Sequence, residues 1–285
     1  MTLGTLASMP LHTLAIAFCL QAPGGARARL MPPAPPADIA ALLAADPAAD
    51  KAAATRLLAE NGVPADRRKL AAEALAKAGG TSPAIVVIDA IAACGGTCGA
   101  TRDLADLLVS MSAECADDKA ALERLAAAAS DAASPVNLAA CRTIAAMPEA
   151  KRPEAHRAMA VRTVAMKTIP GAMQYDVKEV KAKPGEILEF TLENTDTMQH
   201  NLLIVLPGKM SEVGVAADKM GETAAGKACH FVPDMPSVLA VMGLVDPGKS
   251  GRLFFRVPEK PGTYQYVCTY PGHWRMMNGK LKVAK

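Results

Sequence analysis

The chain has 285 residues, of which 51% are hydrophobic and 21% charged, and its net charge at pH 7 is +3. This length is sufficient for two domains, each with its own core. The charge divides between the halves, with a net −2 over residues 29–160 and a net +4 over residues 161–285. These values exclude a nucleic-acid-binding protein, which needs a concentrated basic face. No apolar run is long enough to span a membrane.

The N-terminal region indicates export. Residues 11–20, LHTLAIAFCL, form an apolar stretch of the length found in signal peptides, and residues 26–28, ARA, fit a small-x-small cleavage site. We therefore expect residues 1–28 to be a signal peptide and the protein to be periplasmic or otherwise exported. Because no Lys or Arg precedes Arg27, a disordered tail is the alternative. The Pro-rich residues 29–38 follow as an extended spacer.

Residues 39–160 are rich in Ala and Leu at helical spacing. Ser82-Pro83 and Ser134-Pro135 each offer an N-cap followed by Pro at the first helical position, and Gly79-Gly80 offers a stop. We predict six to eight short helices joined by tight turns. Residues 63–93 resemble a helical hairpin of the HEAT type, so this region is predicted to be an all-α, HEAT-like domain.

Residues 161–285 have the pattern of β-strands, with apolar residues at every second position and Pro-Gly turns between the segments. The clearest alternation is in EILEFTLEN (186–194), GRLFFRVPE (251–259) and TYQYVC (263–268). The pattern predicts a β-sandwich, with residues 211–240 inserted as a helical and loop flap. The fold class is therefore multidomain, with an α-helical part followed by an all-β part.

Four of the seven cysteines lie in the helical part, at Cys94, Cys98, Cys115 and Cys141. In an oxidising compartment they could form two disulfides in any of three connectivities. Buried thiols are a second interpretation. A four-thiolate metal site is a third, although the spacing differs from that of zinc ribbons.

Residues 268–277, CTYPGHWRMM, bring a Cys, a His and two Met into ten positions. Cys268 has the core-facing parity at the end of a predicted strand, and His273 follows after a turn. Two ligands so close in sequence cannot complete a metal site, so a third must come from another strand. His200 immediately precedes an apolar run that is predicted to be a central strand, so a neighbouring position would bring it within reach. The remaining histidines are scattered and are not expected to bind metal: His12, His156 and His230.

This arrangement resembles the cupredoxins, the type 1 (blue) copper proteins, and within them most closely the azurins. Residues 173–194, 198–205 and 264–283 are similar to azurin segments in their order and spacing. The resemblance covers about residues 162–285 and does not extend to the helical part. It implies a Greek-key cupredoxin sandwich that holds one copper ion.

The resemblance also implies a role for each site residue. His200, Cys268 and His273 would form the trigonal plane around copper, with Met277 as the weak axial ligand. Two neighbours of the first ligand have implied roles: the backbone carbonyl of Gln199 approaches the copper, and Asn201 ties the two ligand loops together.

Strand parity independently favours Met277 over Met276 as the axial ligand. Counting back in twos from Leu281, which must face the core, reaches Met277, whereas Met276 shares the parity of the solvent-facing lysines. A β-bulge at Asn278-Gly279 would exchange the two methionines.

A trigonal plane of two His and one Cys with a long axial thioether is a compromise between the preferences of Cu(I) and Cu(II), so little moves on electron transfer. We therefore predict an electron carrier rather than an enzyme, with redox proteins such as cytochromes as partners. The alternative is an interaction or copper-sensing module, in which the helical domain binds an unknown partner and the copper domain is structural. A copper oxidoreductase would need additional histidines for further copper centres.

Overall fold

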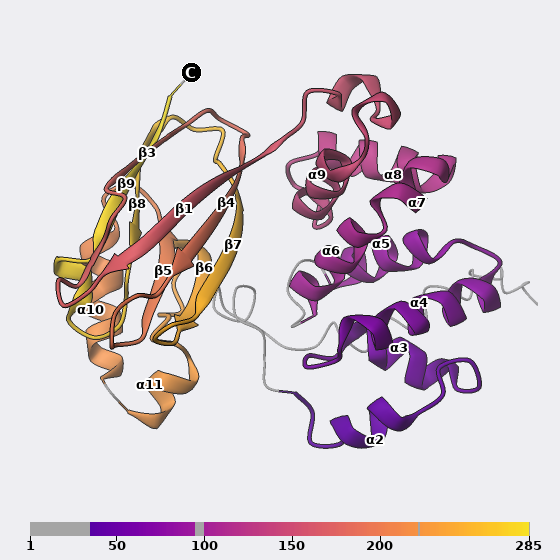
Figure 1. The fold of residues 1–285 in the computed structure, drawn as a ribbon, viewed down its shortest axis with the longest axis horizontal. Helices are drawn as coiled ribbons and strands as arrows, with labels where there is room; N and C mark the ends of the chain where they lie inside the picture. The colour runs from indigo at the N-terminus through magenta and orange to yellow at the C-terminus, as the bar shows by residue number, and fades with distance from the viewer. Residues whose placement is uncertain (1–34, 95–99, 222, 285) are drawn as a thin grey trace, which may run out of the picture.

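The computed structural model describes residues 35–94, 100–221 and 223–284. A helical half is followed in the chain by a β half, and the two lie side by side (Figure 1). The predicted signal peptide and most of the spacer lie outside the described residues. The described helices before the first strand are α2 (Ile39–Ala44), α3 (Lys51–Ala59), α4 (Ala65–Gly79), α5 (Pro83–Ala93), α6 (Thr101–Ser110), α7 (Ser112–Asp117), α8 (Lys119–Ser130), α9 (Asn137–Ala146) and the 3-10 helices η3 (Glu149–Lys151) and η4 (Glu154–His156).

Most capping signals in the helical half have the expected effect. The Ser82 side chain accepts a hydrogen bond from the Ile85 N–H at the start of α5, and Gly80 ends α4 in the left-handed conformation with φ 62°. The predicted helix start at Ser134-Pro135 is wrong, because α9 begins at Asn137. The Asn137 amide donates to three carbonyls around the end of α8, which places residues 134–136 in a turn.

The cysteines of the helical half do not form two disulfides. Cys115 and Cys141 are buried and carry free thiols, which agrees with the buried-thiol interpretation and excludes the two-bridge one. Burial raises the pKa of Cys115 to about 12, so this thiol is unreactive at neutral pH. Cys94 is disulfide-bonded. Cys98 lies outside the described residues, and no metal cluster among the described residues includes a helical-half cysteine.

The strands of the β half form two sheets, which is the predicted sandwich architecture. One sheet has the order β2-β1-β4-β7 and the other β3-β9-β8-β5-β6. The strands are β1 (Val161–Ile169), β2 (Gln174–Tyr175), β3 (Glu179–Ala182), β4 (Ile187–Glu193), β5 (His200–Val205), β6 (Val238–Val245), β7 (Ser250–Arg256), β8 (Gly262–Val267) and β9 (Asn278–Val283).

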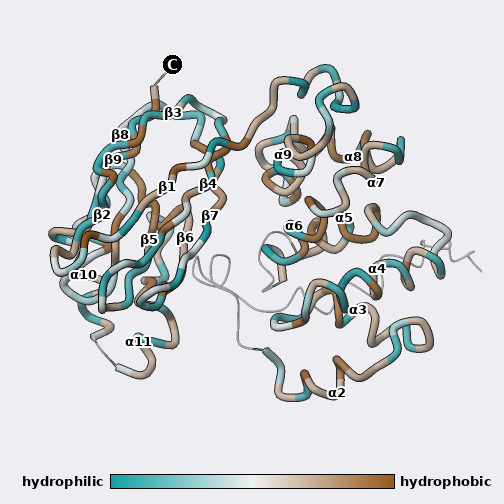
Figure 2. The backbone as a smooth tube through the Cα atoms, viewed as in Figure 1, coloured by the Kyte–Doolittle hydropathy of each residue, from teal (hydrophilic) through white to brown (hydrophobic). Residues whose placement is uncertain are grey.

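Apolar and polar residues alternate along the strands, so that the apolar side chains of both sheets meet in a core between them. The alternation is visible as changing hydropathy along the chain (Figure 2). On β4, Leu188, Phe190 and Leu192 are fully buried, whereas Glu193 is exposed. Tyr264 and Tyr266 of β8 belong to the same core. The predicted strand faces in these segments are confirmed.

The flap, residues 210–237, contains α10 (Met210–Met220) and α11 (Ala224–Ala228) and connects β5 to β6. It forms a separate apolar cluster with the outer face of the five-stranded sheet, in which Val213 and Val232 pack with Leu203, Val205 and residues of β6 and β8. Every residue of β5 is consequently buried. The predicted insertion is confirmed, except that β6 already begins at Val238.

The helical half contacts the β half through α9, which packs against β4 and β7. The buried Arg142 guanidinium lies 3.5 Å from the centroid of the Phe254 ring and pairs with Asp106. Arg252 of β7 also pairs with Asp106, at 3.0 Å, so one carboxylate joins arginines from both halves. Arg256 donates to the Asn137 side chain at 2.6 Å. The helices therefore dock directly on this sheet.

Among the described residues, no single helix combines the length and apolarity needed to cross a membrane, although the bent pair α4–α5 reaches the threshold by length and composition alone.

Candidate metal centre

Three predicted ligands come together at one end of the sandwich. His200 opens β5, Cys268 directly follows β8, and His273 begins the 3-10 helix η5 (His273–Arg275). The antiparallel pairing of β5 with β8 brings the first two side chains close, although they are 68 residues apart in sequence. One potential ligand atom from each of the three side chains lies within 4.8 Å of the others, and all three residues are buried.

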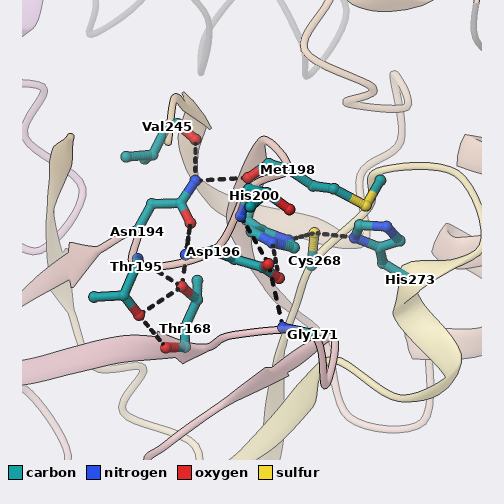
Figure 3. A network of polar contacts seen from close by, with 11 residues as sticks. Thr168, Gly171, Asn194, Thr195, Asp196, Met198, His200, Val245, Cys268 and His273 are labelled. Carbon is teal, nitrogen blue, oxygen red and sulfur yellow. Dashed lines mark hydrogen bonds and ion pairs between the residues drawn. The ribbon is translucent and has the colours of Figure 1, made fainter. Parts of the chain in front are cut away.

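The thiol lies between the two imidazole rings (Figure 3). Its Sγ is 3.9 Å from Nδ1 of His200 and 3.7 Å from Nδ1 of His273, and the ring centroids are 5.1 Å apart. Each ring thus presents the same nitrogen to the sulfur. A sulfur and two imidazole nitrogens that converge in a buried space are the donor set that suits copper in a trigonal site. The residues present therefore fit a copper ion.

The protonated thiol is stable in this environment without a metal. Burial raises the pKa of Cys268 to about 12, although backbone N–H groups of Asn201 and Tyr270 act in the opposite direction. Because a metal binds the thiolate, binding must displace this proton, and metal affinity should rise with pH.

The ligand loop, residues 268–277, is closed by backbone hydrogen bonds. The Cys268 N–H donates to the Met277 carbonyl at 2.9 Å, and the Met277 N–H donates to the His273 carbonyl at 2.8 Å. Met277 is fully buried in the core between the sheets, whereas Met276 is 52% exposed. On β9, Gly279, Leu281 and Val283 are buried and the lysines between them exposed, so no bulge exchanges the two methionines.

Asn201 connects the strand that carries His200 to the ligand loop. Its side chain accepts from the Thr269 N–H at 2.7 Å and donates to the Thr269 hydroxyl at 2.8 Å. The same amide donates to the His230 carbonyl in the flap at 2.8 Å. Asn201 is fully buried, so these bonds hold three segments together beside the metal centre.

The structure reveals a residue that sequence reasoning missed. The Asp196 carboxylate lies 3.1 Å from Nε2 of His200, on the side of the ring opposite the thiol. It also accepts from the N–H groups of Gly171 and Thr197, at 3.2 and 2.7 Å, so its position is fixed (Figure 3). A carboxylate that accepts from one ring nitrogen fixes the tautomer and makes the other nitrogen a stronger donor. The sequence does hold one signal for this role, an Asp four residues before the predicted ligand His200.

Asn194 also holds the segment between it and His200, residues 194–200. Its side chain donates to the carbonyls of Met198 and Val245, each at 2.8 Å, and accepts from the Asp196 N–H at 3.0 Å. These contacts fix the segment that leads into His200 before any metal is present (Figure 3).

We expect Asp196→Asn to weaken Cu(II) binding about tenfold, which is typical for loss of a partner of a metal-binding His. Asn has one acceptor oxygen, and it cannot serve both the His200 ring and the two backbone N–H groups. If Cu(I) binding is unchanged, the reduction potential rises by about 59 mV. Voltammetry and competition titration measure both effects. Glu179→Gln, which removes a surface carboxylate paired with Lys282, is the control; equal potentials for the two variants would contradict the role of Asp196.

The other histidines are not part of this centre. Neither His156 nor His230 belongs to a metal cluster among the described residues. Nδ1 of His230 accepts from the Leu244 N–H at 2.7 Å, and Nε2 of His156 contacts the Ser130 hydroxyl at 3.2 Å. His12 lies outside the described residues. Gln199 directly precedes His200, and its side chain donates to Asp246 at 2.6 Å.

Comparison with known proteins agrees with this geometry. Residues 162–284 match the family described as copper binding proteins of the plastocyanin/azurin family. Azurin-2 from Alcaligenes xylosoxydans xylosoxydans is 34% identical over 123 residues, which are 40% of this chain and 91% of that protein. The chain belongs to the plastocyanin/azurin family of copper-binding proteins. Its cupredoxin domain is the C-terminal part, as the sequence predicted.

Two further relatives match the same part of the chain. Auracyanin-B from Chloroflexus aurantiacus is 37% identical over 98 residues, which are 34% of this chain and 40% of that protein's own length. Outer membrane protein H.8 from Neisseria gonorrhoeae is 32% identical over 120 residues, which are 39% of this chain and 62% of that protein. The chain therefore spans less than half of the auracyanin's length. The predicted cofactor, one copper ion, is confirmed by the family and by the His–Cys–His cluster.

Proposed function

We propose that the protein is a one-electron carrier with a single type 1 copper site, as its family suggests. The observation that supports this proposal most strongly is the buried His–Cys–His cluster. Among the residues that the structure describes, it is the only such group. The described residues therefore offer no second group of this kind, which a copper oxidoreductase would need for a further copper centre. Copper, when bound, supplies the one-electron couple between Cu(II) and Cu(I).

We assign His200, Cys268 and His273 to the trigonal plane and Met277 to the axial position. The burial of Met277 and its backbone bond to Cys268 support this choice over the exposed Met276. A contribution from the Gln199 carbonyl remains part of the proposal. Asn201 and Asp196 hold the donor set in place, and a donor set that does not rearrange suits an electron carrier.

An electron carrier must present its site to other proteins. Met198 and Met276 are 39% and 52% exposed, and they lie two residues before His200 and three residues after His273. Apolar surface of this kind can dock a redox partner. We propose redox proteins such as cytochromes as partners, and no nucleic acid.

We further propose that the protein works outside the cytoplasm. The Cys94 disulfide supports this location, since disulfides persist in oxidising compartments. The name of one relative, outer membrane protein H.8, also supports it. The domain division near residue 160, the HEAT-like pairing of the helices, the Greek-key strand order and an unknown partner of the helical half remain predictions.

Stopped-flow mixing tests the proposed function. The 285-residue protein with Cu(II) is mixed with reduced soluble cytochrome c without oxygen, and apo protein is the control. We expect the blue absorbance to disappear as the cytochrome is oxidised, one electron per copper. If the copper-bound protein stays blue, the interaction or sensing alternative is favoured instead.

A further inference from the structure

The flap contacts the ligand loop, although none of its residues is a proposed copper ligand. The loop supplies Cys268, His273 and Met277, so its conformation sets the position of three of the four proposed ligands. Helix α10 of the flap packs against η5, which begins at His273.

Asp218 of α10 is the centre of these contacts. Its carboxylate accepts from the Gly272 N–H at 2.8 Å, from Nε1 of Trp274 at 2.9 Å and from the Arg275 guanidinium at 3.0 Å. One donor, Gly272, immediately precedes His273, and the other two, Trp274 and Arg275, are the two residues that follow it. Burial alone would raise the pKa of Asp218, but the hydrogen bonds from Trp274, Gly272 and Arg275 lower it, so the carboxylate is ionised at neutral pH.

Trp274 lies directly on the α10 backbone at Gly214. A Cβ atom built at Gly214 would be 2.3 Å from the Trp274 ring, so any larger residue there must displace the indole. Arg275 covers the ring, with its guanidinium carbon 4.3 Å from the ring centroid. The indole is thus held between the helix and an arginine.

The other end of the flap contacts the loop independently. Phe231 packs edge-on against Tyr270 with 4.9 Å between centroids, and Tyr270 in turn packs against His273. The loop is therefore held on both sides of its histidine by one inserted segment.

We propose that the flap is a clamp on the ligand loop, in which Asp218 and Trp274 are positioning residues that keep His273 in its metal-binding position and thereby slow the loss of copper. The inference rests on the proposed copper site. It assigns to the inserted helix a role in metal retention, apart from its packing on the sheet.

The test measures copper release from the full chain. Protein with Cu(II) is mixed with excess EDTA, and the decay of the blue absorbance gives the release rate. Asp218→Asn removes the charge and one acceptor, Trp274→Phe removes one donor, and Gly214→Ala displaces the indole without any change of charge. We expect release to be about tenfold faster for Asp218→Asn, because charge-assisted hydrogen bonds are lost. The other two variants should release copper several-fold faster.

Two controls separate the clamp from general stability. Glu212→Gln neutralises another α10 carboxylate, which pairs with Lys209 at 2.6 Å. Val180→Ala weakens the core at β3, which is not part of the flap. Both should release copper within about twofold of the wild-type rate, even if the unfolding midpoint of the apo protein falls.

The outcomes distinguish the two proposals. A wild-type protein that does not turn blue with Cu(II) rejects the copper site itself. A blue wild type whose three clamp variants release copper at the wild-type rate rejects the clamp alone. The clamp is also wrong if Val180→Ala accelerates release as much as Asp218→Asn does at the same loss of stability.

Discussion

Cys268→Ser is expected to leave the protein colourless in the presence of Cu(II). The intense blue band of a type 1 site arises from charge transfer between a thiolate and copper, and the Cys268 sulfur lies 3.9 Å and 3.7 Å from a nitrogen of each of the two His rings. A serine hydroxyl does not ionise at neutral pH, so it cannot replace the thiolate. We expect complete loss of the band in the visible spectrum of the full chain, and a change to the wide hyperfine splitting of ordinary Cu(II) sites in electron paramagnetic resonance.

Cys229→Ser provides the matched control, because it exchanges the same atoms at the end of α11 on a half-buried residue. This variant should remain as blue as the wild type. A blue Cys268→Ser protein, or a wild type that binds Cu(II) without colour, would show that the type 1 assignment is wrong.

Asn201→Ala should produce the largest loss of stability among the substitutions near the site. It removes one acceptor and two donated hydrogen bonds, and it leaves the buried N–H and hydroxyl of Thr269 without these partners. Unsatisfied buried groups cost about 1–3 kcal/mol each, so we expect the free energy of unfolding to fall by about 3 kcal/mol. Trp274 is the only tryptophan in the chain, so its fluorescence during urea unfolding reports on this half of the protein.

Asn278→Ala is the comparison, because its half-buried side chain donates to the carbonyls of Trp274 and Arg275 at the edge of the loop. We expect it to cost less than about 1 kcal/mol. Similar midpoints for the two variants would mean that the link through Asn201 does not stabilise the domain.

The strands and the metal ligands could be predicted because each leaves a local pattern in the sequence. Alternation in residues 186–194 follows directly from the burial of one face of β4. Cys268 and His273 lie five residues apart, and the apolar run after His200 marks a central strand. Strand parity and the azurin resemblance both selected Met277 over Met276, and the structure agrees, since Met277 is buried and Met276 is exposed.

Contacts between distant segments leave no such pattern. The approach of Asp218 to the ligand loop depends on how the flap folds over the sheet, and an isolated Asp on a helix looks like an ordinary surface residue. Asp196 was overlooked for a related reason, since a carboxylate in the segment NTDT is typical of a turn. The helix start at Ser134 was misplaced because Asn137 serves the end of the preceding helix, which short-range rules do not consider.

The stacking of Arg142 on Phe254 determines how this protein can be shortened. Expression of residues 161–285 alone would remove both Arg142 and Asp106. The Phe254 ring of β7 would then lose its nearer guanidinium and keep Arg252, whose guanidinium carbon is 5.2 Å from the ring centroid. Arg252 and Arg256 would lose their partners in the helical half. Such a fragment would expose more of the Phe254 ring, beside arginines that have lost a partner, and exposed apolar surface of this kind favours association between copies. Its purification would call for a polar substitution at Phe254.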